Sequence, residues 1–138
     1  MDALVSTNGV MNNNVRVRRR SSYCFSRIVT TFTIKLEPFI SLFAEKLKIL
    51  LVVQVDEKNI NFEDQQFLFG AFGKLLGSCR DLNKQIDFMK LLIGPLFSQL
   101  QQVSSQNVPN NVNKHQYFDV ICRIIEAAGI LIIFHSLF

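Results

Sequence analysis

A pair of amphipathic helical segments that recurs along the chain is the feature that most constrains the fold. The first pair covers residues 15–51, and a similar pair covers residues 63–103, about 44 residues further on. In both pairs, apolar residues recur every three or four positions, which is the spacing of one helix face. Stacked helix pairs present extended surfaces to partners, so the repeat favours binding over catalysis.

The composition supports a buried core in a single all-α domain. Of the 138 residues, 49% are hydrophobic, and only three prolines and six glycines interrupt the helical pattern. Helix pairs that repeat every 40–47 residues or so are typical of HEAT-like proteins. We therefore expect a HEAT-like α-solenoid segment of antiparallel helix pairs, with about five helices.

The helical pattern divides the chain into four regions. Residues 1–14 are polar and rich in asparagine, which predicts a disordered lead-in. The first helix pair is expected over residues 15–54 and the second over residues 61–106. Residues 113–138 are expected to form an unpaired or truncated C-terminal helix.

Punctuating residues indicate where the helices begin and break. Pro38 fits the first turn of the second helix, where its missing N–H costs nothing. Asn61 can cap the third helix, and the acidic pair Glu63 and Asp64 favours its positive end. Pro95 lies inside the fourth helical segment and predicts a kink or a break there.

The same spacing predicts which apolar side chains are buried. In the first two helices they are Cys24, Phe25, Ile28, Val29, Phe32, Phe39, Leu42, Phe43, Leu47, Leu50 and Leu51. In the third and fourth helices they are Leu68, Ala71, Phe72, Leu75, Leu76, Cys79, Ile86, Met89, Ile93, Leu96, Leu100 and Val103.

Positive charge is concentrated in the first helical segment. Residues 15–36 hold six basic residues and no acidic one, whereas the rest of a chain of net charge +4 sums to −2. A focused patch of this kind suits an anionic partner such as nucleic acid. The candidate nucleic-acid-binding residues are Arg16, Arg18, Arg19, Arg20 and Arg27.

Guanidinium groups pair bidentately with phosphate oxygens, so closely spaced arginines suit an RNA or DNA backbone. On a helix, Arg16, Arg19, Arg20 and Arg27 fall on roughly one side, while Arg18 points elsewhere. Two other interpretations stay open. A nuclear localisation signal needs only a basic run, and a solvated helix face needs no partner at all.

Catalytic and cofactor motifs are missing from the sequence. It contains no glycine-rich phosphate loop, and its two histidines, His115 and His135, lie far apart. The cysteines are too far apart in sequence for a metal knuckle and lie in apolar helical patterns; they are Cys24, Cys79 and Cys122. We therefore expect no enzyme activity, no catalytic residue, no metal and no cofactor.

The most hydrophobic stretch is Ala127–Phe138, which is only 12 residues long. A membrane-spanning helix needs about 20 apolar residues. A buried helix is therefore expected here, without membrane insertion, although association of this tail with a membrane is an open alternative.

Three stretches resemble the exportin-T family of tRNA export receptors. RSSYCFSRIVTTFTIKLEPFI resembles its basic and aromatic segment before a Pro-Phe-Ile corner, here Arg20, Tyr23, Phe25-Ser26-Arg27, Lys35 and Pro38-Phe39-Ile40. FEDQQFLFGAFGKLLGSC resembles its Asp-Gln and aromatic helix, here Asp64-Gln65, Phe67, Phe69 and Gly73. LLIGPLFSQLQQV resembles its leucine- and proline-containing helix, here Leu91, Leu92, Pro95 and Leu96.

The resemblance covers about residues 15–103 and implies a function. It implies a fragment of a nuclear transport receptor that exports tRNA from the nucleus to the cytoplasm with a Ran-type GTPase in its GTP form. The expected partners are tRNA, that GTPase and nuclear pore proteins, and the expected localisation is shuttling between nucleus and cytoplasm. Residues 110–138 match no part of the family pattern that we can place.

Two alternatives remain at this point. The chain could come from another karyopherin of the importin-beta-like class, whose members share the acidic start of the third helix. It could also be a generic HEAT-repeat scaffold that binds proteins without binding RNA. Full receptors are long superhelices of many repeats, and this chain holds about two and a half.

Overall fold

The fold is all-α, as predicted. The computed structural model describes residues 1–53, 61–105 and 114–137, and no strand occurs among them. Five α-helices and two 3-10 helices follow one another in the order α1 Val15–Leu36, η1 Glu37–Phe39, α2 Ile40–Leu47, η2 Lys48–Leu51, α3 Phe62–Ser78, α4 Leu82–Ser105 and α5 Lys114–Leu137.

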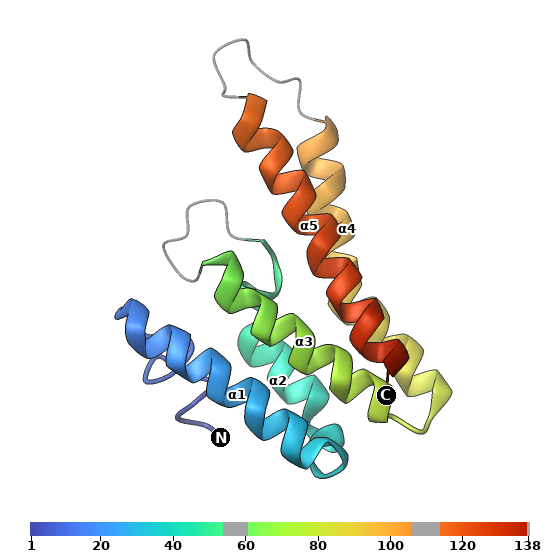
Figure 1. Ribbon diagram of the computed structural model, residues 1–138. Helices are drawn as coiled ribbons and strands as arrows, with labels where there is room; N and C mark the ends of the chain where they lie inside the picture. The colour runs from blue at the N-terminus through green and yellow to red at the C-terminus, as the bar shows by residue number, and fades with distance from the viewer. Residues whose placement is uncertain (54–60, 106–113, 138) are drawn as a thin grey trace.

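The helices form two layers. Helices α1, α3 and α5 lie side by side in one layer, and α2 and α4 lie behind them (Figure 1). In the first layer α1 packs on α3 and α3 packs on α5, while α4 packs against both α2 and α5. This is the stacked arrangement of helix pairs that the sequence repeat predicts.

Residues 1–14 are an ordered cap on α1, which corrects the expected disordered lead-in. A series of turns folds this segment back on itself, with Val10 N donating to Leu4 O at 2.9 Å. Val5 and Val10 are 2% and 0% exposed and belong to the main core. A Cβ at Gly9 would lie 2.0 Å from Leu4 O, so only glycine allows this close turn.

An ion pair holds the start of the cap against the second layer. Lys46 Nζ of α2 lies 2.6 Å from Asp2 Oδ1. The hydrogen bond from Lys46, together with its charge, lowers the pKa of the Asp2 carboxyl. Because the Asp2 side chain is exposed, this pair positions the cap more than it stabilises it.

Helix α1 has the predicted boundaries but is bent near its end. Asn14 caps its start by accepting a hydrogen bond from Arg16 N at 2.9 Å. At Phe32 the backbone leaves helical geometry, with φ −119° and ψ 30°. Just before and after it, Thr31 and Thr33 donate to backbone carbonyls four residues earlier, a bond that bends helices. The bend leaves Phe32 48% exposed, so its predicted burial is wrong.

The core centres on α3, where the predicted burial is confirmed throughout. All six predicted positions of this helix, from Leu68 to Cys79, are buried, together with Phe69. In the second helix the prediction fails at Phe39 and Leu42, which are exposed. The chain leaves Pro38 through a 3-10 turn, and this turns Ile40 and Ala44 inward instead.

Polar side chains close the connection into α3. Asn61 caps this helix as predicted, because its Oδ1 accepts from Asp64 N at 2.8 Å. The buried Gln65 Nε2 donates to the backbone carbonyls of Leu50 and Val52, at 2.8 and 2.7 Å. These two bonds tie the end of the first helix pair to the start of the second.

Helix α4 runs through Pro95 without interruption, so the predicted break is wrong. Proline at this position removes the N–H that would bond the Leu91 carbonyl. Leu91 and Pro95 are both exposed, so water can reach the carbonyl that loses its partner. The predicted core position Ile86 is also exposed, and Leu92 is buried in addition to Leu96.

Helix α5 packs against α3 and α4. Ile124, Ala127 and Leu131 are buried and follow one another at three- and four-residue spacing. They form the contact face of the helix and extend the core to this end of the stack.

Candidate nucleic-acid interface on α1 and α3

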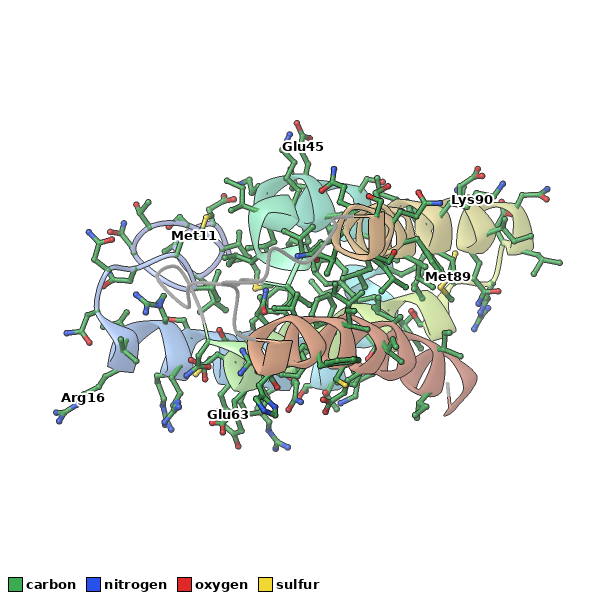
Figure 2. All side chains as sticks on the ribbon, turned by 90° about the horizontal axis from the view of Figure 1, so that it is seen from above. Met11, Arg16, Glu45, Glu63, Met89 and Lys90 are labelled. Carbon is green, nitrogen blue, oxygen red and sulfur yellow. The ribbon has the colours of Figure 1, made fainter. Side chains whose placement is uncertain are left out.

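The outer face of the first layer carries most of the candidate arginines. Arg16 and Glu63 project from this face, whereas Glu45 and Lys90 project from the opposite face, formed by α2 and α4 (Figure 2). Arg16, Arg20 and Arg27 are exposed on α1, on the side away from its buried residues Phe25 and Val29. The expected common side of these arginines is therefore present.

Arg18 is a structural residue, which corrects its place among the binding candidates. It points to the other side of α1, as predicted, and is only 5% exposed. Its Nη1 donates to the backbone carbonyls of Asn12 and Asn13, both at 2.9 Å. The guanidinium thus fixes the cap to α1, and it is not available to a ligand.

Arg19 is neutralised by the acidic start of α3. Its Nε lies 3.1 Å from Asp64 Oδ1, and its Nη2 lies 3.5 Å from Glu63 Oε2. The Asp64 side chain is almost fully buried, and its Oδ2 has no hydrogen-bond partner among the described residues. Asp64 therefore depends on Arg19 for its charge balance, and Arg19 holds α1 against α3.

Arg20 lies at an aromatic contact between the two helices. Its guanidinium carbon is 5.8 Å from the centre of the Tyr23 ring, within the range of a cation–π contact. Tyr23 in turn meets Phe67 of α3 edge to face, with ring centroids 5.7 Å apart and an interplanar angle of 83°. Both rings are more than a third exposed.

These residues line a shallow pocket of about 740 Å³ between the first turns of α1 and α3. Its lining consists of Arg16, Arg19, Arg20, Tyr23, Glu63, Asp64, Gln66 and Phe67. Helix α1 has no acidic residue in its first turn, so its positive end and its arginines add to one another. The acidic side chains of α3 occupy one wall, and Arg16 and Arg20 leave the other wall cationic.

A second cationic cluster lies further along the same two helices. Lys74 Nζ of α3 donates to Thr30 Oγ1 of α1 at 2.7 Å. Burial and, after it, the nearby charge of Arg27 lower the pKa of Lys74. Sequence reasoning missed Lys74 as part of the basic surface.

The 44-residue repeat in the sequence could have predicted which residues of α1 and α3 are in contact. Arg19 and Glu63, Tyr23 and Phe67, and Thr30 and Lys74 are each 44 residues apart, and each pair is in contact. Equivalent positions of neighbouring repeats therefore face each other across α1 and α3.

Between α3 and α5 the spacing is longer. Gln66 Nε2 donates to Glu126 Oε1 at 2.8 Å, 60 residues further along the chain. Arg123 lies over the Phe62 ring, 5.6 Å from its centre. The separation of contacting residues between α3 and α5 is therefore longer than the 44 residues found between α1 and α3.

The remaining groups that could carry chemistry are the cysteines, histidines and carboxylates outside this pocket. In the described part of the chain, no three His, Cys, Asp or Glu side chains are close enough to hold a metal ion. Cys79 is buried, and burial, followed by a hydrogen bond with Glu37, raises the pKa of its thiol. No helix in the described residues is long and apolar enough to cross a membrane.

Comparison with known proteins decides the family. The family model for Exportin-T matches residues 1–133. The chain belongs to the exportin-T family. The match runs beyond the stretches that carry the resemblance, since it includes the cap and most of α5. Residues 110–133 thus belong to the family pattern, which corrects the expectation that they match nothing in it.

Three curated exportin-T relatives support this assignment. The chain is 31% identical over 106 residues to Exportin-T of Kluyveromyces lactis, which covers 73% of this chain and 10% of the relative. It is 30% identical over 128 residues to Exportin-T of Scheffersomyces stipitis, with 83% and 13% covered. It is 29% identical over 132 residues to Exportin-T of Arabidopsis thaliana, with 85% and 13% covered.

The chain spans between 10% and 13% of the length of these exportin-T relatives. No solved structure matches the chain. Exportin-T is a nuclear export receptor family, and the described residues of this chain form a stack of helices.

Proposed function

We propose that this chain is part of a receptor that exports tRNA from the nucleus to the cytoplasm, and that Arg16, Arg20 and Arg27 contact tRNA phosphates. One observation carries the proposal. These three guanidinium groups are exposed on one face of α1, and none has a carboxylate partner among the described residues. A phosphate backbone can supply the negative charge, because guanidinium groups bond phosphate oxygens bidentately.

The exposed aromatic rings support an RNA partner. Tyr23 and Phe67 lie beside Arg20 and within the pocket, where a base or ribose can stack on them. Contacts of this kind read the shape and backbone of RNA more than its sequence.

The wider receptor function is proposed from family membership. We infer that tRNA binds together with a Ran-type GTPase in its GTP form, that nuclear pore proteins are further partners, and that the receptor shuttles between nucleus and cytoplasm. In this scheme the described segment supplies one part of the receptor surface that binds tRNA.

The test is tRNA binding by the 138-residue chain, measured by fluorescence anisotropy at increasing salt. We expect the affinity to fall steeply with salt, because phosphate contacts release counterions. Replacing Arg16 and Arg20 together by alanine should lower the slope of log affinity against log salt by about 1.4–1.8. Lys84→Ala with Lys90→Ala is the matched control, because it removes the same charge from exposed positions on α4.

Two results would refute the RNA role of α1. One is absent or salt-insensitive tRNA binding. The other is an equal loss of slope in the Lys84 and Lys90 control, because it would show that net charge alone governs binding.

A protein-binding scaffold, whether another karyopherin or a generic HEAT-repeat protein, is the alternative function. The exposed carboxylate of Glu63 in the pocket wall favours it, because this group repels phosphate and attracts basic peptide segments. This alternative predicts no tRNA binding at any salt concentration in the same titration.

A further inference from the structure

The pocket between the first turns of α1 and α3 combines groups of opposite character. Arg16 and Arg20 make part of its lining cationic, and Glu63 adds an exposed carboxylate. The rings of Tyr23 and Phe67 belong to the same lining. A phosphate alone would use the arginines and be repelled by the carboxylate. The lining therefore fits a ligand that carries a phosphate, a flat ring and hydrogen-bond donors.

Glu63 is an acceptor that its neighbours do not need. Its Oε2 lies 3.5 Å from Arg19 Nη2, and its side chain is 82% exposed. Arg19 has a closer partner in the buried Asp64, whose Oδ1 lies 3.1 Å from Arg19 Nε. An exposed ion pair such as that of Glu63 contributes little to stability. The carboxylate of Glu63 can therefore turn to a ligand without leaving Arg19 unpaired.

The two aromatic rings offer a stacking surface for a nucleobase. Tyr23 and Phe67 are 41% and 37% exposed and meet edge to face. The guanidinium of Arg20 lies over the Tyr23 ring, so we assign the base to Phe67. Every base has a π-face, so stacking tolerates any of them. Selectivity between bases has to come from a polar group, and Glu63 is the exposed carboxylate of this lining.

We propose that this pocket binds one guanine nucleotide unit of the RNA, and that Glu63 accepts hydrogen bonds from the N1–H and 2-amino groups of the base. The inference rests on the proposed RNA role of α1. A carboxylate has two acceptor oxygens and no donor. Guanine has two adjacent donors on its Watson–Crick edge, which match these oxygens.

The other three bases fit this carboxylate less well. Adenine and cytosine place an acceptor nitrogen beside their amino group, and uracil places a carbonyl on each side of its N3–H. Each would bring an acceptor against Glu63, which costs affinity because neither atom has a proton to share. Arg16 and Arg20 lie one helical turn apart and would bind the phosphate of the same nucleotide.

The test is binding of two short RNAs of about seven nucleotides to the 138-residue chain, measured by fluorescence anisotropy. One RNA contains only adenosine, and the other has a single central guanosine. The guanosine RNA should bind about tenfold more tightly, which is typical of a bidentate contact with one base. Inosine keeps N1–H and lacks the 2-amino group, so an RNA with inosine at the centre should have an intermediate affinity.

Glu63→Gln should remove the preference for guanosine, because an amide has only one acceptor oxygen. Glu45→Gln is the matched control, because it makes the same change of charge on the opposite face of the molecule (Figure 2). This control should keep the tenfold preference. Circular dichroism checks that both variants are folded.

Phe67→Ala separates stacking from base reading. It should weaken binding of both RNAs by about fivefold or more and leave their ratio unchanged, because stacking does not identify the base.

Three results would overturn the inference. Equal affinities of the wild-type chain for the two RNAs would show that no guanine is read. A preference that survives in Glu63→Gln would place the reading at another residue. Loss of the preference in Glu45→Gln as well would assign it to net charge. The proposed function has its own readout, the salt dependence of tRNA binding, which can persist when the guanosine preference is absent.

Discussion

The two edges of the helix stack meet their surroundings in opposite ways. At the α1 edge, fourteen residues of polar sequence fold over the helix, bury two valines and leave arginines exposed. At the α5 edge, Phe118, Ile125 and Ile132 are exposed, while Arg123 and Glu126 contact α3. The two outer helices of the described stack thus differ, since α1 is covered by the cap and exposes charge, whereas α5 exposes apolar side chains.

The difference shows that a short irregular segment can cover an outer helix of the described stack without itself forming a helix. Its anchors are two apolar side chains and one arginine, Arg18, which bonds the backbone carbonyls of the segment. The arginines of α1 therefore have different roles. Arg18 is used to hold the cap, Arg19 to hold α3, and Arg16 and Arg20 face solvent.

The largest expected effect on stability comes from placing an aspartate at each edge in turn. Val10→Asp buries an unpaired charge beneath the cap and should lower the free energy of unfolding by about 3–5 kcal/mol. Ile125→Asp puts the same charge in solvent. In dilute protein, it should change the free energy of unfolding by less than about 0.5 kcal/mol. Urea denaturation measures both. Equal losses would show that the two edges do not differ in this way.

A smaller effect is expected within the arginine cluster. Arg18→Ala removes two charge-assisted hydrogen bonds to the cap and should cost about 1.5–3 kcal/mol. Arg16→Ala is its matched control two residues away and should stay within about 0.5 kcal/mol. Thermal unfolding by circular dichroism distinguishes them, and a tolerated Arg18→Ala would contradict its role in holding the cap.

The smallest effect should be a gain at the open edge. Gly129→Ala adds helix propensity where no described atom obstructs a Cβ, so the dilute protein should gain up to about 1 kcal/mol. Denaturant titration at low protein concentration measures this gain. A loss of stability would mean that the position is already closely packed.

Much of the first layer could be predicted from the sequence. Helix α1 has the expected bounds, and the α3 core follows from regular spacing after a recognisable Asn61 cap. Residues that contact each other between α1 and α3, such as Tyr23 and Phe67, are also 44 positions apart in the repeat. Only the structure shows that such equivalent positions are in contact.

The rest depends on tertiary contacts that local pattern does not encode. The buried residues Val5 and Val10 are five positions apart, which is neither helix nor strand spacing, so the cap becomes visible only when its path over α1 is known. Arg18 bonds backbone carbonyls, which have no sequence signature. Phe32 has ideal helical spacing for burial, yet the bend at this residue turns it outward.

The central claim is that the charged α1 edge is the RNA-contacting surface. Photo-crosslinking of tRNA to the 138-residue chain tests it most directly. The crosslinked peptides are identified by mass spectrometry. We predict crosslinks at Tyr23 and Phe67, the exposed rings beside Arg20, and in the peptides that carry Arg16 and Arg27. Crosslinks confined to α2 and α4, on the opposite layer, would contradict the account.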